Sequence, residues 1–521
     1  MSPPRQLRIR TASGTSDLPL PEAGDLSLAD WLGENGHPLN TRCGGRGICR
    51  GCRVEIDGQS QRACQLPVAE LSDRTSELFI PDSSLHDEKL DGVSAFEIGL
   101  GGLNFRRRPG IGLALDIGTT TVAAALWDLG DGRCLAEGAA ANAQRRHGDN
   151  VLARIESARA SGSSRTLQKT LLERSVHPLV AKLLQSAGLE PGSITEAMAS
   201  GNTVMLHTLV GAPLDGFAAY PFRPVFLDGR ICRAEALGFA SDFPLRLVPG
   251  LGAFVGGDIT AGALASGMFE SDRPSLLIDF GTNGEILLKT PEGSLAAATA
   301  AGPAFEGGRL NCGRPAAPGV IGALRFEDGR WRGIRIGGEK ARPVPGLAGS
   351  AYIDFMAEAR GNGLLSRMGR FERGHPLLRN RDIDGEATPA VEVGPEVFIT
   401  EADIAELMQA KAAILGGAHA LMEEAGLEPA ELESVYVAGG FGYHLHPGHA
   451  LAVGLLPDVP RERIRVIGNS SLAGASLLLQ TDIEADLEGL RRRCRALELN
   501  QIDSFEDHFI DAMPLEACRP E

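Results

Sequence analysis

Four of the nine cysteines lie within 22 positions near the N-terminus, and their spacing is the strongest chemical signal in the chain. They are Cys43, Cys49, Cys52 and Cys64, separated by five, two and eleven residues. Cysteine thiolates grouped in this way bind zinc or an iron–sulfur cluster. Four glycines between Cys43 and Cys52 let the loop turn sharply and point amide N–H groups at anionic sulfur. We therefore predict a metal-binding loop with all four cysteines as ligands.

The spacing favours a [2Fe–2S] cluster, and a four-thiolate zinc site is the alternative. Only Cys49 and Cys52 have the spacing of a zinc-ribbon pair, and a ribbon normally has two such pairs. The remaining cysteines are scattered, and we expect each to be a small buried residue or an incidental one rather than a ligand. They are Cys134, Cys232, Cys312, Cys494 and Cys518.

A second signal is a repeated turn, in which an apolar run ends in a carboxylate, a glycine and hydroxyl or amide side chains. Residues 116–121 read DIGTTT, and residues 279–283, which begin 163 positions later, read DFGTN. The glycine lets the turn expose N–H groups to a phosphate. The carboxylate at the strand end suits a hard cation such as Mg²⁺. We predict that Asp116 and Asp279 are the catalytic carboxylates and that they lie on the side of the site that holds Mg²⁺.

Further glycine turns complete a candidate nucleotide cleft. Residues 200–203 (SGNT) lie between an extended segment and a helix, where a glycine turn can bind an anion. Residues 435–442 read as a buried strand that ends in a glycine turn, where the backbone could approach an adenosine. The predicted cofactor-binding residues are Gly118, Thr119, Thr120, Gly201, Asn202, Gly281, Thr282, Asn283, Gly439 and Gly440.

Each of these residues also has a structural interpretation. The glycines could serve only their turns, and the two aspartates could cap loops. For Glu306 and His207 a structural role is an equal alternative to a role in the site. The chain has no Gly-x4-Gly-Lys-Ser/Thr motif, so it is not a P-loop enzyme.

The elements that position these residues follow from hydrophobic patterns. Residues 7–10 alternate like a strand, and Ser27 is the expected N-cap of a short helix. Residues 54–58 read as a strand that enters a turn, which would return Cys64 to the cysteine loop. In the body, residues 121–127 should pair back onto the strand before Asp116, and a helix should begin near Val151.

Composition limits the class of protein. A chain of 521 residues is too long for one core, and a length prior suggests three or four domains. The formal charge of −16 argues against nucleic acid or a membrane as the main partner. No apolar stretch reaches the ~18–20 residues of a membrane span, and the N-terminus lacks the apolar core of a signal peptide. We therefore expect a cytoplasmic location.

Taken in order, the glycine turns resemble those of the acetate-kinase/sugar-kinase/Hsp70/actin (ASKHA) superfamily. The cysteine loop resembles that of plant-type ferredoxins, and the whole order resembles the reductive activators of corrinoid proteins. This resemblance implies an α+β ferredoxin-like (β-grasp) [2Fe–2S] domain followed by a duplicated α/β, RNase H-like ASKHA fold. The implied division is a ferredoxin domain at 1–80, a linker at 81–110, ASKHA halves at 111–270 and 271–480, and a C-terminal packing segment at 481–521.

The resemblance also implies a function, namely ATP-dependent reduction of an inactive Co(II) corrinoid to Co(I) through the cluster. The implied cofactors are a [2Fe–2S] cluster, ATP and Mg²⁺. The implied partners are a corrinoid protein of a methyltransferase system and an electron-donor reductase or ferredoxin, and a homodimer is left open. Plant-type clusters lie near ~−400 mV and Co(I) formation is harder still, which gives ATP a reason to be present. The alternatives are a nucleotide-sensing electron-transfer protein without ATP turnover and a small-molecule kinase with a redox sensor.

Three features depart from the family pattern. Some relatives carry an extra small domain after the linker, and this chain has no room for one. Relatives tend to have Asp where this chain has Asn150, and Tyr443-His444 is bulkier than expected after the adenosine turn. We expect the arginines at 106–108 to be solvated in the linker. We expect residues 487–497 to form a basic helix that leads to a packing helix near the C-terminus.

Overall fold

The computed structural model describes residues 6–516 except for several short stretches and the longer segments 40–51 and 85–105. The shorter gaps are 12–13, 22–25, 38, 57, 72–76, 82–83, 149, 161–163, 339–341, 384 and 482–483. Two of the predicted ligands, Cys43 and Cys49, therefore lie outside the described residues. None of the helices in the described ranges is both long and apolar enough to span a bilayer.

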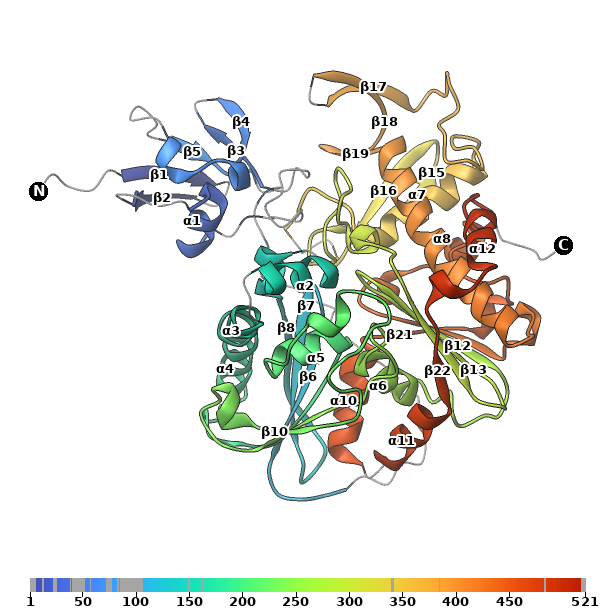
Figure 1. Ribbon diagram of the computed structural model, residues 1–521. Helices are drawn as coiled ribbons and strands as arrows, with labels where there is room; N and C mark the ends of the chain where they lie inside the picture. The colour runs from blue at the N-terminus through green and yellow to red at the C-terminus, as the bar shows by residue number, and fades with distance from the viewer. Residues whose placement is uncertain are drawn as a thin grey trace, which may run out of the picture.

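The N-terminal region is a five-stranded sheet packed on one helix, beside the larger body, which it contacts through an ion pair between Asp30 and Arg146 (Figure 1). Its elements are β1 (Gln6–Thr11), β2 (Gly14–Pro19), α1 (Leu28–Glu34), β3 (Arg53–Ile56), β4 (Gln59–Arg62) and β5 (Glu77–Phe79), in sheet order β2-β1-β5-β3-β4. The alternation at residues 7–10 buries Leu7 and Ile9 against α1, as predicted. The Ser27 side chain accepts a hydrogen bond from the Asp30 amide and so caps α1, also as predicted.

The first half of the body contains a sheet in the order β10-β11-β9-β6-β7-β8. Its strands are β6 (Ile111–Ile117), β7 (Thr121–Asp128), β8 (Cys134–Ala141), β9 (Ile194–Gly201), β10 (Ile231–Arg233) and β11 (Pro244–Leu247). Strands β6, β7 and β8 form an antiparallel meander, and β9 and β11 continue the sheet in parallel with β6. The helices are α2 (Val151–Ala160), α3 (Arg165–Leu171), α4 (His177–Ser186), α5 (Thr203–Leu209) and α6 (Gly257–Ala265).

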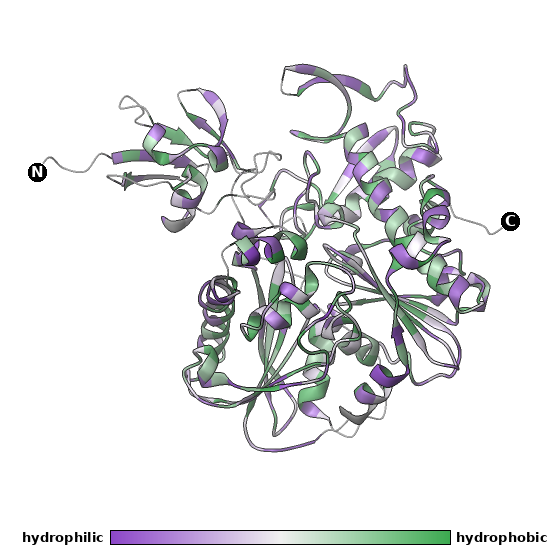
Figure 2. Ribbon diagram, in the orientation of Figure 1, coloured by the Kyte–Doolittle hydropathy of each residue, from purple (hydrophilic) through white to green (hydrophobic). Residues whose placement is uncertain are grey.

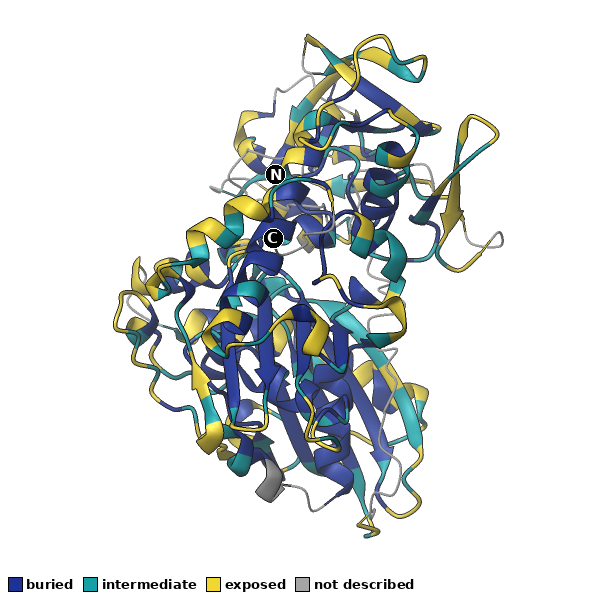
Figure 3. Ribbon diagram, turned by 90° about the vertical axis from the view of Figure 1, so that its right-hand side faces the viewer, coloured by how far each residue is buried: buried dark blue, intermediate teal, exposed yellow. Residues whose placement is uncertain are grey.

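The second half repeats this topology. Its strands are β12 (Ser275–Phe280), β13 (Gly284–Lys289), β14 (Ser294–Thr299), β20 (Ser434–Ala438), β21 (Ile464–Gly468) and β22 (Cys494–Ala496), in the order β21-β20-β12-β13-β14-β22. Strands β12, β13 and β14 form the same meander, and β20 and β21 run parallel to β12. The central strands of both large sheets are apolar and mostly buried, whereas the edge strands β8, β10, β21 and β22 are partly exposed (Figures 2 and 3). The predicted duplication is therefore present in the strand order itself.

An insertion between β14 and β20 adds two small sheets and two helices. The sheets are β15 (Ile321–Glu327) with β16 (Arg330–Arg335), and β17 (Leu378–Ile383) with β18 (Glu386–Gly394) and β19 (Val397–Thr400). The helices are α7 (Gly349–Gly361) and α8 (Glu401–Glu424). A reciprocal capping box between Thr400 and Asp403 fixes the start of α8.

The two halves meet through α6 and α10 (Ser470–Gln480), which cross at the centre of the body (Figure 1). Two glycines allow the close approach. A Cβ at Gly474 would collide with the backbone of Ala261, and a Cβ at Gly262 would press on Ser470. Because each helix follows the last parallel strand of its own sheet, this contact brings the carboxyl ends of both sheets to one cleft.

Two packing expectations are wrong in part. The basic helix α11 (Glu484–Arg493) stops at Arg493, and residues 494–496 form β22, which pairs with β14 and hides its edge. Arg106 and Arg107 are exposed, as expected, whereas the Arg108 side chain is docked on the body. The Arg106 amide donates to the Gln480 carbonyl, and Arg108 pairs with Glu196 at 2.7 Å. The C-terminal packing helix is confirmed as α12 (Phe505–Asp511), which lies along α8.

Candidate functional site

A cavity of about 150 Å³ lies between the two halves, at the carboxyl ends of β6 and β12. Eleven of the twelve site residues that the sequence predicts in the body line this cavity. They are Asp116, Gly118, Thr119, Thr120, Asn202, Asp279, Gly281, Thr282, Asn283, Gly439 and Gly440. The twelfth, Gly201, is buried beside the wall of the cavity rather than in it.

Gly201 and Gly439 occupy equivalent places at the ends of β9 and β20. Both have positive φ angles, of 150° and 89°. A Cβ at Gly201 would strike the Ile117 carbonyl oxygen, and a Cβ at Gly439 would strike that of Phe280. Each glycine therefore lets the end of its parallel strand lie close to the Asp-x-Gly-Thr hairpin of the same half.

Asp116 is held by two side chains from α10. Ser471 Oγ donates to one carboxylate oxygen at 2.8 Å, and Asn469 Nδ2 donates to the other at 2.9 Å. Asn469 is fixed in this orientation because its own oxygen caps α10 by accepting from the Leu472 amide. Burial raises the pKa of Asp116 to about 6, and the two hydrogen bonds oppose that rise.

Asp279 lies among other carboxylates. Burial, and then the negative charges of Asp258, Asp116 and Glu306, raise its pKa well above the ordinary value. Burial likewise raises the pKa of Asp258 to about 7 and that of Glu285 well above its ordinary value. Asp258, Asp279 and Glu285 all line the cavity. A cation entering the cleft would therefore meet an electrostatic environment that favours it strongly.

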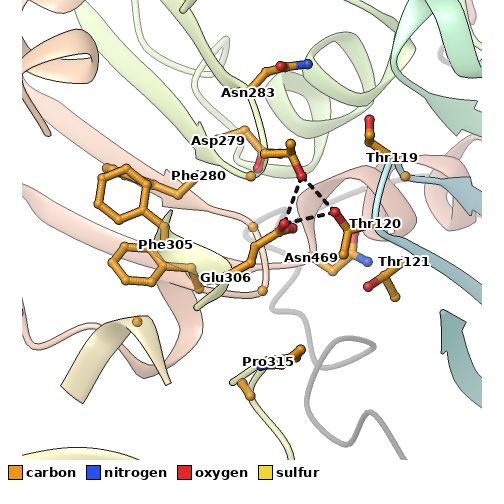
Figure 4. A pocket seen from close by; sticks show the side chains of 18 of the residues that line it. Thr119, Thr120, Thr121, Asp279, Phe280, Asn283, Phe305, Glu306, Pro315 and Asn469 are labelled. Carbon is orange, nitrogen blue, oxygen red and sulfur yellow. Dashed lines mark hydrogen bonds between the residues drawn. The ribbon is translucent and has the colours of Figure 1, made fainter. Parts of the chain in front are cut away.

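Three oxygen atoms converge where the two halves face each other (Figure 4). Thr120 Oγ1 lies 2.7 Å from Thr282 Oγ1, so the two predicted phosphate hairpins touch directly. Glu306 Oε2 accepts from Thr120 at 2.9 Å and from Thr282 at 2.8 Å. The sequence interpretation left Glu306 undecided, and the structure places its carboxylate in the cleft.

Three phenylalanines pack behind this triangle. The ring centroids of Phe280 and Phe305 lie 5.5 Å apart, and those of Phe305 and Phe441 lie 4.9 Å apart. Phe280 follows Asp279, Phe305 precedes Glu306, and Phe441 belongs to the candidate adenosine turn. The aromatic cluster therefore joins three separate motifs into one wall.

Among the described residues that line the cavity there is no lysine and no arginine. A phosphate here would have to be bound by backbone N–H groups, hydroxyl groups and a divalent cation. The buried Arg154 supports the first hairpin from behind by donating to the Thr119 carbonyl oxygen at 2.6 Å. The site has the composition of a cleft for a metal-bound polyphosphate.

Comparison with known proteins agrees with this geometry. The family described as "RACo middle region" matches residues 111–271, and the family described as "C-terminal domain of RACo the ASKHA domain" matches residues 273–520. The chain belongs to the RACo family. The predicted ASKHA-type α/β fold of the body is thereby confirmed.

The similar proteins carry consistent names. A solved structure of a reductive activator for corrinoid, iron-sulfur protein is 26% identical, with a TM-score of 0.72 over 98% of both chains. The corrinoid activation enzyme RamQ of Eubacterium limosum is 29% identical over 403 residues, which are 74% of this chain and 66% of RamQ. The [Co(II) methylated amine-specific corrinoid protein] reductase of Methanosarcina barkeri is 27% identical over 326 residues, covering 56% of this chain and 57% of the reductase. The chain thus spans just under two thirds and just over half of these two curated relatives.

Sequence reasoning missed four side chains of this RACo-family cleft as site residues. They are Asn469, Ser471, Asp258 and Glu285, to which the sequence analysis gave no role. A usable signal was present, because residues 258, 469 and 471 follow the last parallel strand of each half. Polar side chains at the carboxyl ends of parallel strands gather at one edge of a sheet.

The structure shows where the positions that the sequence left in doubt lie, namely Asn150, His207, Tyr443 and His444. The Asn150 oxygen accepts from the Ala153 amide and so caps α2. His207 is fully buried, accepts from the Val225 amide and stacks on Phe226, so its role is structural. Tyr443 points to solvent, whereas His444 lines the cavity.

The cysteine loop can be followed only at its C-terminal side. Cys52 and Cys64 are both buried at the open end of the β3–β4 hairpin, where the Ala63 amide donates to the Cys52 carbonyl oxygen. The hairpin therefore returns Cys64 to the loop, as predicted. Within the described residues no three His, Cys, Asp or Glu side chains are arranged to hold a metal ion, but two of the four candidate ligands lie outside them.

Proposed function

We propose that this protein uses ATP to drive the reduction of a Co(II) corrinoid, carried by a partner protein of a methyltransferase system, to Co(I). The observation that carries the proposal is the duplicated cleft, in which two Asp-x-Gly-Thr hairpins meet at a 2.7 Å contact between Thr120 and Thr282. The names of the similar proteins, all activators or reductases of corrinoid proteins, supply the reaction class.

We propose that residues 1–80 form a [2Fe–2S] domain, joined through 81–110 to ASKHA halves at 111–270 and 271–480, with 481–521 packing on the second half. Two observations support the first assignment. The sheet has its last strand, β5, in the centre and parallel to β1, which is the β-grasp arrangement. Cys52 and Cys64 are buried next to each other, as ligands of one cluster would be. Cys43 and Cys49 complete the proposed ligand set.

In the cleft, we assign Asp116 and Asp279 to the cation that accompanies the nucleotide. A magnesium ion there would neutralise phosphate charge. The hairpins at 118–120 and 281–283 would hold phosphate oxygens with N–H and hydroxyl groups. At Gly439 and Gly440 the backbone would lie close to the adenosine. Because the pKa values of Asp116 and Asp258 are raised to about 6 and about 7, these groups would release protons when a cation binds.

The reduction needs one electron for each cobalt. The electron would come from an external reductase or ferredoxin, pass through the N-terminal cluster, and convert Co(II) to Co(I) on the partner. ATP binding and hydrolysis would favour a docked conformation in which this unfavourable transfer can occur. The chain's own contribution is the cleft between the halves, whose wall the nucleotide would rearrange.

Spectroscopy and hydrolysis on the purified full-length protein test the proposal. After reconstitution with iron and sulfide, the reduced protein should give a one-electron [2Fe–2S] EPR signal, and Cys64→Ser should lose it while still binding nucleotide. Hydrolysis of ATP should be faster with a Co(II) corrinoid protein. A bound zinc ion without an EPR signal would contradict the cluster assignment, and stoichiometric reduction without ATP turnover would identify a nucleotide sensor.

A further inference from the structure

Glu306 makes a contact that the proposed nucleotide function does not require. Its carboxylate oxygen accepts hydrogen bonds from Thr120 of the first half and Thr282 of the second half, at 2.9 and 2.8 Å. Each threonine hydroxyl has one proton to donate. Two protons are therefore available for the three close contacts among the oxygens of Thr120, Thr282 and Glu306. Glu306 thus bridges the two halves at the point where their hairpins face each other (Figure 4).

A carboxylate in this position resembles a bound anion. The hydroxyls that it accepts from belong to the two hairpins that we assign to phosphate oxygens. Its negative charge is felt in the cleft, because Glu306 contributes to the raised pKa of Asp279. A phosphate and the Glu306 carboxylate would therefore compete for the same two hydroxyl donors and repel each other.

The loop that carries Glu306 is connected to both ends of the cleft. The short helical turn Pro303–Glu306 is flanked by Gly302 and Gly307, which have φ angles of 75° and 76°. These left-handed positions let the chain turn into the cleft and out again. Phe305, next to Glu306, packs on Phe280 and on Phe441 of the candidate adenosine turn. Displacement of Glu306 would thus be transmitted to the adenosine side.

We propose that Glu306 is a built-in substitute for the nucleotide's phosphate, which latches the two halves together in the ligand-free protein and is displaced when the nucleotide binds. This inference rests on the proposed nucleotide function and assigns a competing role to a carboxylate inside that site. Binding then exchanges one bridge between the halves for another, so the cleft stays closed while its wall is rearranged.

Nucleotide affinity gives the first test. Full-length Glu306→Gln should bind Mg²⁺ with the non-hydrolysable analogue AMPPNP about tenfold more tightly by calorimetry, because a neutral amide competes less well for the two hydroxyls. In a Thr282→Val background, which removes one of the contested donors, the gain from Glu306→Gln should shrink. An unchanged or weaker affinity of Glu306→Gln would mean that Glu306 assists binding or only supports the loop, and would overturn the proposal.

Hydrogen exchange of the ligand-free protein gives the second test. Amides of the β6–β7 and β12–β13 turns should exchange several-fold faster in Glu306→Gln than in the wild type, because the bridge that holds them is weakened. This measurement needs no nucleotide, so it tests the latch even if the wild type binds no AMPPNP and the proposed function fails. Unchanged exchange in both turns would show that Glu306 does not hold the halves together.

Discussion

The two halves of the body share a topology but differ in what each supplies to the other's aspartate. The helix at the end of the second half, α10, presents an amide and a hydroxyl to Asp116. The corresponding helix of the first half, α6, begins with Asp258, whose charge raises the pKa of Asp279. Among the described residues no hydrogen-bond donor reaches the Asp279 carboxylate.

This asymmetry separates two roles that the repeated motif makes look alike. Fixed protein donors hold the Asp116 carboxylate in place before any ligand arrives, and they offset part of the effect of burial, which raises its pKa. The Asp279 carboxylate is disfavoured as an anion until a positive charge enters the cleft. Duplication therefore produced one pre-organised carboxylate and one that responds to a cation.

Exchanging each aspartate for asparagine should separate the two roles most clearly. Asp279→Asn should lower kcat for ATP hydrolysis by at least about 100-fold, a magnitude typical of losing one charged group in a site, and should leave the melting temperature unchanged or higher. Asp116→Asn should also lower kcat, but should destabilise the body by about 1–3 kcal/mol, because an amide cannot accept from both Ser471 and Asn469. Calorimetric melting and a phosphate-release assay on both variants measure this difference. Equal destabilisation by the two changes would contradict the asymmetry.

The pH dependence of stability should carry the same signature. Asp116 and Asp258 have pKa values of about 6 and about 7 in the folded protein, against about 3.9 when unfolded. The folded state therefore holds more protons in this interval, so the metal-free protein should lose stability as pH rises from about 4 to about 7.

In chelator, the melting temperature of the wild type should fall over this pH interval by at least about 3 °C more than that of a matched Asp258→Asn variant. Saturating Mg²⁺ and AMPPNP should flatten the profile, because the cation favours the anions. A melting temperature that rises through this interval in chelator would contradict the account.

The equivalent glycines allow a smaller and more local comparison. Gly201→Ala and Gly439→Ala place a side chain against a backbone carbonyl at positive φ, so each should cost about 1–3 kcal/mol. Only Gly439→Ala should weaken AMPPNP binding as well, because Gly439 lines the cavity and Gly201 does not. Calorimetric titration of both variants, with Gly192→Ala as an uncrowded control, decides this. Equal losses of affinity would place Gly201 in the binding surface.

The smallest expected effect concerns one histidine in the second half. His449 lies on α9 (Pro447–Ala452) and pairs with Asp354 at 2.7 Å, which raises its pKa. The pair contributes fully below pH 6.5 and is lost as pH rises through the raised pKa. His449→Asn should therefore cost up to about 1 kcal/mol at pH 6 and less at pH 9, measured by urea unfolding. A larger cost at pH 9 would refute the charged pair.

Sequence reasoning found what depends on local pattern. The apolar runs before Asp116 and Asp279 became β6 and β12 because each strand is buried on both faces, and the glycine after each aspartate marked its turn. The sequence could not show that α10 crosses to the first half and donates to Asp116, because that contact joins positions 353 residues apart. Nor could it show that Arg108 docks on Glu196, because a charge run in a linker has the same composition whether packed or solvated.

The same reasoning explains why Glu306 stayed undecided and why Cys494 was placed in a helix. A glycine-flanked carboxylate is equally consistent with a loop and with a site until its partners are known, and here the partners are threonines from two different hairpins. Residues 494–496 continue a basic helical pattern, but the unpaired edge of β14 provides hydrogen bonds that the helix end does not.

The most direct test of the central claim is the formation of Co(I) with and without ATP. Reduced, reconstituted protein is mixed anaerobically with a Co(II) corrinoid protein, and Co(I) is followed by its absorbance. We predict that Co(I) accumulates only when Mg²⁺ and ATP are present. The Asp279→Asn variant should form no Co(I) even with ATP, while its cluster spectrum is retained. Co(I) formation at the full rate without ATP would contradict the central claim.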